Sequence, residues 1–366
     1  MSKQKTGKVY RIILAGSGRV ARHHVQAISY LEKEGRARLV AICGPDQVGT
    51  EALLQKHYKG KHKHVAYYPD LTAGLAQEEA DLVALATPSG THKDLGLEAL
   101  AAGCHILVEK PLAMTYADGL ELAEAAAAAG KKLALGHKYR YLPCMADLAS
   151  DLQAGKFGQV YYGSVILRWG HDQAYYDRAP WVGTRAADGG VILNQSVHAF
   201  DLLRWLMGLE NQPLLETQGF AATQSHEMES EDLGLGVFHF AGDRYISYEG
   251  TTSSQPDRQQ VELFICCEQA DIRAGLIGKK PHLSIYSQGK DLRWSYLRRY
   301  LGRVFRQGGL KGLWALKNPH TAIYSDLLIA IEDDRDPLAS SSAGLSSLEM
   351  VEALCQASGI LATSPN

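Results

Sequence analysis

The sequence predicts an α/β protein of two domains, in which an N-terminal doubly wound parallel sheet is followed by a C-terminal α+β domain. With 366 residues, the chain exceeds the length at which one hydrophobic core usually stops growing. Short apolar runs alternate with helical patterns from residue 9 to residue 136, and longer strands with polar alternation follow after about residue 140. We therefore expect a first domain over residues 1–137 and a second over residues 138–366.

Five short apolar runs in the first domain each predict a buried strand. A helix is predicted over Tyr116–Ala129, which is rich in Ala, Leu and Glu and stops at Gly130. Strands that alternate with helices form βαβ units and a parallel sheet. The predicted strands are Val9–Ala15, Leu39–Cys43, Leu82–Ala86, His105–Val108 and Lys132–Leu135.

The second domain carries longer strands with one polar side, which suits a sheet that has one face covered by helices and the other partly open. An open face of this kind is often covered by self-association, so we expect a homodimer or a homotetramer. Leu345–Leu361 predicts an amphipathic closing helix, for which packing back on the first domain stays open. The predicted strands are Val160–Trp169, Leu233–Phe240, Arg244–Gly250 and Gln259–Cys266.

Composition argues against several classes of function. The formal net charge is −2 and both signs are spread along the chain, so nucleic acid is a poor candidate partner. None of the six cysteines forms a zinc-knuckle or CxxC pair, which favours a reducing, cytoplasmic location. The polar, basic start of the chain fits neither a signal peptide nor a membrane span. We expect no metal site, because no acid or cysteine accompanies His57, His62 and His64.

A glycine-rich turn follows the first predicted strand and predicts a dinucleotide site. Gly16-Ser17-Gly18-Arg19-Val20-Ala21 has the form GxGxxA. The first glycine permits the bend, the second lets the backbone approach a pyrophosphate, and the alanine allows the helix to pack closely on the strand. The position of the motif between a first strand and a helix strengthens this interpretation over that of a turn without a ligand.

The second strand ends differently from most dinucleotide-binding strands. Glycine stands where an acid usually binds the adenosine ribose, and the nearest acid, Asp46, follows two residues later. Two interpretations stay open for Asp46, a contact to the ribose hydroxyls and a solvated turn residue after Pro45. No basic cluster there favours a 2′-phosphate, so we predict NAD, with NADP still open.

Two further stretches stand at the carboxyl ends of predicted strands, where open α/β sheets bind ligands. Thr87, Pro88 and His92 follow one strand, and Glu109-Lys110-Pro111 follows the next. We expect all of them except Pro111 to line the cofactor site. A lysine beside a positively charged nicotinamide should have a lowered pKa, so Lys110 is a candidate for proton transfer.

A third stretch, Asp188 to Gly208, has helical apolar spacing from Ile192 to Met207. Asn194, His198 and Asp201 stand at i, i+4 and i+7, which places them on one face of a helix. Polar groups on one side of an apolar helix point at a partner or a pocket. The alternative for His198 is a hydrogen-bonded core histidine, and the company of Lys110 and Asn194 favours catalysis.

Together these motifs resemble the Gfo/Idh/MocA family, the glucose-fructose oxidoreductase and inositol dehydrogenase group. The resemblance rests on GxGxxA at 16–21, Glu109-Lys110-Pro111, the segment 136–143 and GG-x8-H-x-x-D at 189–201. It implies an N-terminal Rossmann domain, a C-terminal α+β domain on a large open mixed sheet, and a sugar or polyol as substrate. It also implies that Lys110 contacts substrate and cofactor and that His198 is the acid/base. Arg140 and Trp181 join Asn194 and Asp201 as expected substrate-binding residues.

The chain departs from the family pattern at one position. Many members carry aspartate where Asn194 stands, and an asparagine can orient a substrate but cannot accept a proton. Proton transfer then falls to His198 and Lys110. The Asn194-Gln195-x-x-His198 pattern, with Trp181-x-Gly183-Thr184 upstream, looks most like the branch of nucleotide-sugar 3-dehydrogenases and 3-ketoreductases.

Other interpretations stay open. The segment 292–318 carries seven basic residues and no acid around an apolar stripe, so it predicts a basic amphipathic helix. That helix either docks on the sheet or a neighbouring subunit, contacts a membrane surface, or clamps a substrate phosphate. For the whole chain, the alternatives to a dehydrogenase are a glycosidase that oxidises its substrate transiently on retained NAD and a cofactor-binding regulator without turnover.

Overall fold

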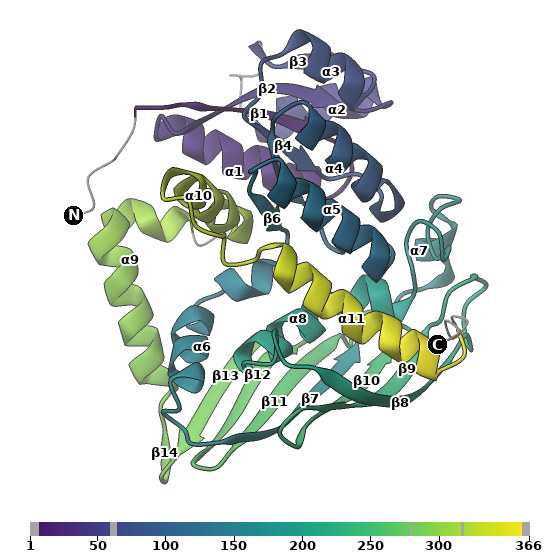
Figure 1. The fold of residues 1–366 in the computed structure, drawn as a ribbon, viewed down its shortest axis with the longest axis vertical. Helices are drawn as coiled ribbons and strands as arrows, with labels where there is room; N and C mark the ends of the chain where they lie inside the picture. The colour runs from purple at the N-terminus through teal and green to yellow at the C-terminus, as the bar shows by residue number, and fades with distance from the viewer. Residues whose placement is uncertain (1–6, 59–63, 279, 316–317, 361–366) are drawn as a thin grey trace. The chain divides into compact units, whose positions relative to one another are not determined.

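Two separate β-sheets organise the chain in the computed structural model, which describes residues 7–58, 64–278, 280–315 and 318–360 (Figure 1). Each sheet belongs to its own compact unit. The first unit comprises Met1–Ala113, Ala117–Tyr141 and Arg303–Ser342. The second comprises Met114–Tyr116, Leu142–Gly302 and Ala343–Asn366. The chain thus contributes a late segment to the unit that contains its beginning.

The sheet of the first unit has six parallel strands in the order β3-β2-β1-β4-β5-β6. This is the strand order of a Rossmann fold, and the predicted doubly wound domain is confirmed. Its strands are β1 (Tyr10–Ala15), β2 (Ala37–Cys43), β3 (Ala66–Tyr68), β4 (Leu82–Leu85), β5 (His105–Val108) and β6 (Leu133–Leu135). The helices between them are α1 (Ala21–Lys33), α2 (Gln47–His57), α3 (Leu71–Gln77), α4 (His92–Ala101) and α5 (Tyr116–Ala128).

A helix from the C-terminal part of the chain completes the core of this unit. α10 (Pro319–Glu332) packs against α1, and Ile323, Tyr324, Leu327 and Leu328 are buried in the same hydrophobic cluster as the strands. Asn318 caps α10 through the N–H of His320, and Pro319 occupies the first turn, where its missing N–H costs nothing. One helix of the Rossmann unit therefore comes from a part of the chain some 300 residues after α1. The hydrogen bond between His24 of α1 and Tyr324 of α10 shows this contact directly.

The second unit contains a mixed sheet of eight strands in the order β14-β13-β12-β11-β7-β10-β9-β8. β7 and β10 are parallel, and the other neighbours are antiparallel. The strands are β7 (Val160–Arg168), β8 (Leu214–Ala222), β9 (Leu233–Phe240), β10 (Arg244–Thr251), β11 (Gln260–Cys267), β12 (Ala270–Ile277), β13 (Lys280–Ser287) and β14 (Lys290–Asp291). The remaining helices are α6 (Met145–Gln153), α7 (Gln173–Asp177), α8 (Val197–Leu206), α9 (Arg293–Ala315) and α11 (Ser341–Ala357).

The two faces of this sheet differ. α8 packs on β7 and β11, and Leu354 of α11 lies over the paired residues Gly219 and Gly236. A Cβ at Gly219 would lie 2.3 Å from Leu354 Cδ1, so the glycine is what lets α11 approach. On the opposite face Phe220, paired with Leu235, is 78% exposed. The predicted large mixed sheet with one covered and one open face is confirmed.

Every strand that the sequence predicts is present, with ends that differ by a few residues. The sequence analysis missed β3, β8 and β12–β14, which are short, polar or glycine-containing and give no clear alternation. The basic segment forms α9, and the closing helix is α11; Lys317 and Leu361, which belonged to those predictions, lie outside the described residues. None of the helices over the described residues is both long and apolar enough to cross a bilayer.

Replacing Leu354 by Ala should lower the free energy of unfolding by about 2–5 kcal/mol, because the cavity over the two glycines cannot close. Urea denaturation measures this change. Leu120→Ala on α5, where the leucine is 37% exposed, is the matched control and should change stability by no more than about 0.5 kcal/mol. Equal losses in both variants would show that α11 does not depend on this contact.

Candidate functional site

The glycine turn after β1 has the geometry of a dinucleotide turn. Gly16 has φ of +99°, and its N–H donates to the carbonyl oxygen of Cys43 at 2.8 Å. A Cβ there would lie 2.5 Å from the carbonyl oxygen of Ala86, so only glycine fits. The turn follows β1 and lies against the carboxyl ends of β2 and β4. The strand order reverses at this point of the sheet, and sheets of this kind bind ligands there.

The start of α1 is open to an anion. Apart from Gly18 itself and its two chain neighbours, no described residue has an atom within 4 Å of the place where a Cβ of Gly18 would stand. Val20 at the N-cap gives no side-chain hydrogen bond, and the first turn of α1 contains no acid. The amides at a helix start carry partial positive charge, so the turn is suited to a pyrophosphate. Ser17 and Arg19 belong to the same turn, and their contacts to a cofactor stay predictions.

Asp46 has a structural role. It is the N-cap of α2, and its Oδ1 accepts the N–H of Gly49 at 2.8 Å. The hydroxyl of Thr50 donates to the Asp46 carbonyl oxygen at 2.8 Å. This arrangement matches the turn interpretation of the residue, and a contact from Asp46 to the ribose stays a prediction.

The loop after β4 is tied to the segment after β5 by His92. The buried ring faces two backbone carbonyl oxygens, that of Pro111 at 2.8 Å from Nδ1 and that of Thr87 at 3.2 Å from Nε2. Burial lowers the pKa of His92, so the neutral ring has one N–H, which we assign to the closer Pro111 oxygen. Both ring nitrogens of His92 thus lie against backbone carbonyl oxygens. Cofactor contacts from Thr87, Pro88 and His92 remain predictions.

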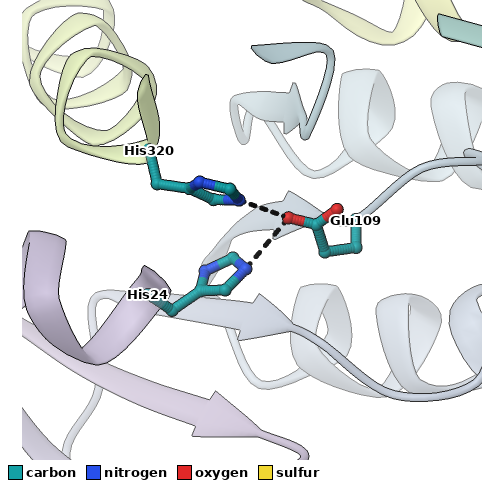
Figure 2. Close-up of side chains that lie close together, drawn as sticks. All are labelled: His24, Glu109 and His320. Carbon is teal, nitrogen blue, oxygen red and sulfur yellow. Dashed lines mark hydrogen bonds and ion pairs between the residues drawn. The ribbon is translucent and has the colours of Figure 1, made fainter. Parts of the chain in front are cut away.

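Glu109 lies in a buried cluster with two histidines from distant helices (Figure 2). Its Oε1 accepts the Nε2–H of His24 of α1 at 3.0 Å and that of His320 of α10 at 2.8 Å. The other oxygen, Oε2, accepts the backbone N–H of Lys110 at 3.3 Å. Glu109 was expected at the cofactor; the structure instead turns its carboxylate to the interior, and a cofactor contact stays a prediction.

The protonation states in this cluster follow from burial and hydrogen bonding. Burial alone would raise the pKa of Glu109, but the hydrogen bonds from His24 and His320 outweigh it and hold the pKa well below its ordinary value. Burial lowers the pKa of His24, which is therefore neutral. Its Nδ1 accepts the hydroxyl of Tyr324 at 2.9 Å, so both ring nitrogens are satisfied.

The same three side chains have the donor set of a metal site, since their ligand atoms all lie within 4.8 Å of one another. Hydrogen bonds of 2.8 and 3.0 Å already account for the arrangement, however. A metal ion would also require both Nε2 atoms to lose their protons. In addition, His320 Nδ1 has no acceptor among the described residues for the proton it would then carry. We therefore treat the cluster as hydrogen-bonded.

In the second unit, Asn194 lies in a π-helical turn, Val191–Gln195, directly before α8. Its side-chain amide donates to Oδ1 of Asp188, while Oδ2 of Asp188 accepts the N–H of Gly183 at 2.8 Å. π-helical turns are rare and frequent at functional sites. The amide of Asn194 is thus fixed by a buried aspartate, as an orienting group requires.

The helix predicted over Ile192–Met207 is irregular at its start. Val191–Gln195 forms a π-helical turn, and the regular α-helix begins at Val197. A face shared by Asn194 and the two later residues stays a prediction. His198 is half-buried, whereas Asp201 is 1% exposed. Roles for Asn194, His198 and Asp201 in substrate handling stay predictions.

Two expected substrate-binding residues have contrasting positions. Arg140 of the first unit is buried and donates from Nη1 to the carbonyl oxygen of Leu338 at 3.1 Å. Trp181 of the second unit is 38% exposed and follows α7. Substrate contacts from either residue remain predictions.

The basic helix α9 docks within the second unit through its N-terminal half. Arg299 pairs with Asp147 of α6 at 3.0 Å and with Asp151 at 3.1 Å. Tyr296 of α9 is buried beside them. The N-terminal half of α9 therefore docks on α6. Docking on the sheet or on a neighbouring subunit stays a prediction.

The sequence analysis missed His24, His320 and Tyr324. His24 follows Gly18 by six residues and reads as an ordinary buried helix position. His320 lies 211 residues from Glu109, and no local pattern links the two. Only the fold of the late helix α10 onto α1 brings them together.

Comparison with known proteins gives a consistent result. Residues 10–137 match the model of the oxidoreductase family with an NAD-binding Rossmann fold. Residues 146–273 match the GFO/IDH/MocA C-terminal domain. The rhizopine catabolism protein MocA of Rhizobium meliloti is 31% identical over 204 residues, which are 55% of this chain and 58% of that protein. The chain thus spans between about a third and three fifths of the length of the curated relatives it matches.

Solved structures match over nearly the whole chain. The WlbA dehydrogenase of Bordetella pertussis, in complex with NADH and UDP-GlcNAcA, is 26% identical in sequence and matches with a TM-score of 0.80. The match covers 96% of this chain and 97% of that protein. The WlbA dehydrogenase of Chromobactrium violaceum, in complex with the same two compounds, is 28% identical and matches with a TM-score of 0.81. This match covers 97% of this chain and 95% of that protein.

The buried cluster predicts acid sensitivity. The folded-state pKa of His24 is depressed, so neutral His24 contributes stability that is present above pH 6.5 and is lost as the pH falls below it. The depressed pKa of Glu109 adds a loss below pH 4.5. The free energy of unfolding should therefore fall below pH 6.5, by up to about 1.4 kcal/mol per pH unit for each proton taken up on unfolding.

Urea denaturation between pH 7.5 and pH 5 measures this slope. His24→Gln keeps an N–H donor but does not titrate, so its slope should be smaller than that of the wild type. Identical slopes in the two proteins would contradict the inference that His24 takes up a proton when the protein unfolds at low pH.

Proposed function

This chain belongs to the Gfo/Idh/MocA family of NAD-binding oxidoreductases, and we propose that it transfers a hydride between a nicotinamide and a hydroxyl or keto carbon of a sugar, polyol or nucleotide-sugar. The observation that carries the proposal is the glycine turn at Gly16, open beside Gly18, together with Lys110 at the carboxyl end of β5, a strand of the same sheet. NAD-linked chemistry needs a pyrophosphate site and a proton carrier near the same sheet edge. The first unit supplies both.

Bound NAD supplies the acceptor of the hydride, C4 of its nicotinamide. In the proposed reaction Lys110 or His198 takes the proton from a ring hydroxyl, while the carbon that bears this hydroxyl gives its hydride to C4 of the nicotinamide. The reverse reaction reduces a ketone. Asn194, fixed by Asp188, orients the substrate and takes no proton. General acid/base catalysis of this kind contributes about 100-fold to 10,000-fold in rate.

For the substrate we propose a nucleotide-sugar. Two similar structures were solved with NADH and UDP-GlcNAcA, and each matches almost the full length of this chain. The Asn194-Gln195-x-x-His198 pattern, which resembles the nucleotide-sugar 3-dehydrogenases, supports the same class. We propose NAD over NADP, because no basic cluster follows β2.

For the assembly we propose a cytoplasmic homodimer or homotetramer formed through the open face of the eight-stranded sheet. Phe220, Leu235 and Val237 lie side by side on β8 and β9, and they are 78%, 39% and 48% exposed. Contiguous exposed apolar side chains of this kind mark interaction surfaces. A membrane contact through the segment 292–318 is the weaker alternative, since α9 docks on α6.

Replacing Lys110 or His198 by Ala should lower kcat by about 100-fold or more, because each removes a proton carrier, while the Kd for NADH changes little. The assay follows NADH absorbance with UDP-GlcNAcA and a panel of free sugars and inositols. Lys33→Ala, at an exposed lysine of α1, is the control and should match the wild type.

Three outcomes separate the functions. Net NADH formation supports the dehydrogenase. Cleavage of a glycoside without net NADH would establish the glycosidase instead, and tight NADH binding without turnover on any compound would establish a regulator. Wild-type activity in both alanine variants would remove Lys110 and His198 from the mechanism.

Replacing Phe220 by Asp should shift the sedimentation coefficient from that of a dimer or tetramer to that of a smaller species, because the charge would be buried unpaired. Val48→Asp, at a 79% exposed valine of α2, is the matched control and should not change it. A monomeric wild type, or an unchanged assembly in Phe220→Asp, would contradict an interface on this face.

A further inference from the structure

Lys110 lies beyond the end of strand β5. The strand ends at Val108, and the N–H of Glu109 donates to the carbonyl oxygen of Leu85 at 3.0 Å. Lys110 follows at the edge where ligands bind. A side chain that moves protons must be held close to one position, so the contacts that fix the backbone here matter for the proposed reaction.

Buried side chains hold the backbone on both sides of Lys110. Its own N–H donates to Glu109 Oε2 at 3.3 Å, and the carbonyl oxygen of Pro111 accepts the Nδ1–H of His92 at 2.8 Å. Pro111 has no N–H of its own. The position of Lys110 therefore depends on the position of the Glu109 carboxylate on one side and of the His92 ring on the other.

The Glu109 carboxylate is in turn fixed by two helices (Figure 2). His24 of α1 and His320 of α10 donate to the same oxygen, Oε1, from two different directions. On the other side, a Cβ at Gly136 would lie 2.8 Å from Oε2, so the backbone there closes the remaining space. The carboxylate has no room to rotate without losing one of its donors.

His320 is buried at a cost in free energy. Its Nδ1 is buried and has no hydrogen-bond partner among the described residues. A buried polar atom without a partner costs about 1–3 kcal/mol. The hydrogen bond that Nε2 donates to Glu109 Oε1 is the polar contact that offsets this cost.

We propose that His24 and His320 are positioning residues, which fix Lys110 through the Glu109 carboxylate. Through His320, the helix α10 then helps to position a residue that acts in the reaction. The proposal rests on the proposed function, because it assumes that Lys110 carries a proton. α10, Pro319–Glu332, lies beyond the segments 10–137 and 146–273 that match the family models. The catalytic lysine of the first unit is thus set in place by a helix from the last sixth of the chain.

The test compares two replacements of His320 in the full-length protein with NAD bound. His320→Gln keeps an N–H donor at the reach of Nε2, whereas His320→Leu removes it at similar volume. If His320→Leu does not fold, His320→Asn replaces it, because the shorter amide does not reach Glu109. His105→Leu is the matched control, since this histidine stands at the opposite end of β5, where its Nδ1 accepts the N–H of Lys132 at 2.9 Å.

Two readouts are used. Competitive labelling with acetic anhydride, followed by peptide mass spectrometry at several pH values, reports the pKa and reactivity of Lys110 without any sugar substrate. Turnover with UDP-GlcNAcA separates kcat from KM. In His320→Leu the labelling rate of Lys110 should change by at least about threefold, which corresponds to about 0.5 pKa unit. Its kcat should fall about 10-fold to 100-fold with little change in KM or in NADH affinity.

His320→Gln should restore both readouts to near wild type, and His105→Leu should leave both unchanged even if it lowers the melting temperature. An unchanged Lys110 labelling profile in His320→Leu would overturn the proposal and leave His320 a structural residue. So would a failure of His320→Gln to restore the profile. The proposed function fails separately, if Lys110→Ala keeps its activity.

Discussion

The hydrogen bonds that two histidines donate to one buried carboxylate oxygen are the constraint on which the first unit depends. Burying a carboxylate is costly unless hydrogen bonds replace its water. Glu109 receives them from α1 and from α10, so the charge can be buried only when the beginning, the middle and the end of the chain are folded together. The same bonds connect α1, the helix that follows the glycine turn, with the segment that carries Lys110.

This constraint gives the late helix α10 a reason to belong to the Rossmann unit. Its apolar residues Ile323 and Leu327 fill the core beside the strands, and its polar residues His320 and Tyr324 complete the cluster. The second unit is built on a different principle, a wide mixed sheet with α8 and α11 on one face and exposed apolar residues on the other. The first unit thus holds the cofactor turn and a lysine, and the second holds the histidine and asparagine proposed to meet the substrate.

The sequence predicted those parts of the molecule whose signals are local. Buried strands of the Rossmann sheet, the GxGxxA turn and the lysine after β5 each follow from a few adjacent residues. Three kinds of feature could not be predicted in this way. The edge strands β3 and β14 are too short to show a period, and the π-helical turn at Asn194 changes the spacing without a marker in the sequence. The partnership of Glu109 with His320 depends on a tertiary contact across 211 residues. Similarly, His92 and Arg140 are residue types that suggest ligand binding, yet the His92 ring faces two backbone carbonyl oxygens and Arg140 donates to the carbonyl oxygen of Leu338.

In the proposed reaction, a lysine of the first unit and a histidine of the second act on one substrate hydroxyl beside a bound nicotinamide. A crystal structure of the full chain with NADH and UDP-GlcNAcA would show whether they do. We expect the pyrophosphate over Gly16 and Gly18, and we expect Lys110 Nζ and a ring nitrogen of His198 each within about 3 Å of the same sugar oxygen. Lys110 and His198 facing separate cavities, or a pyrophosphate bound away from the glycine turn, would contradict it.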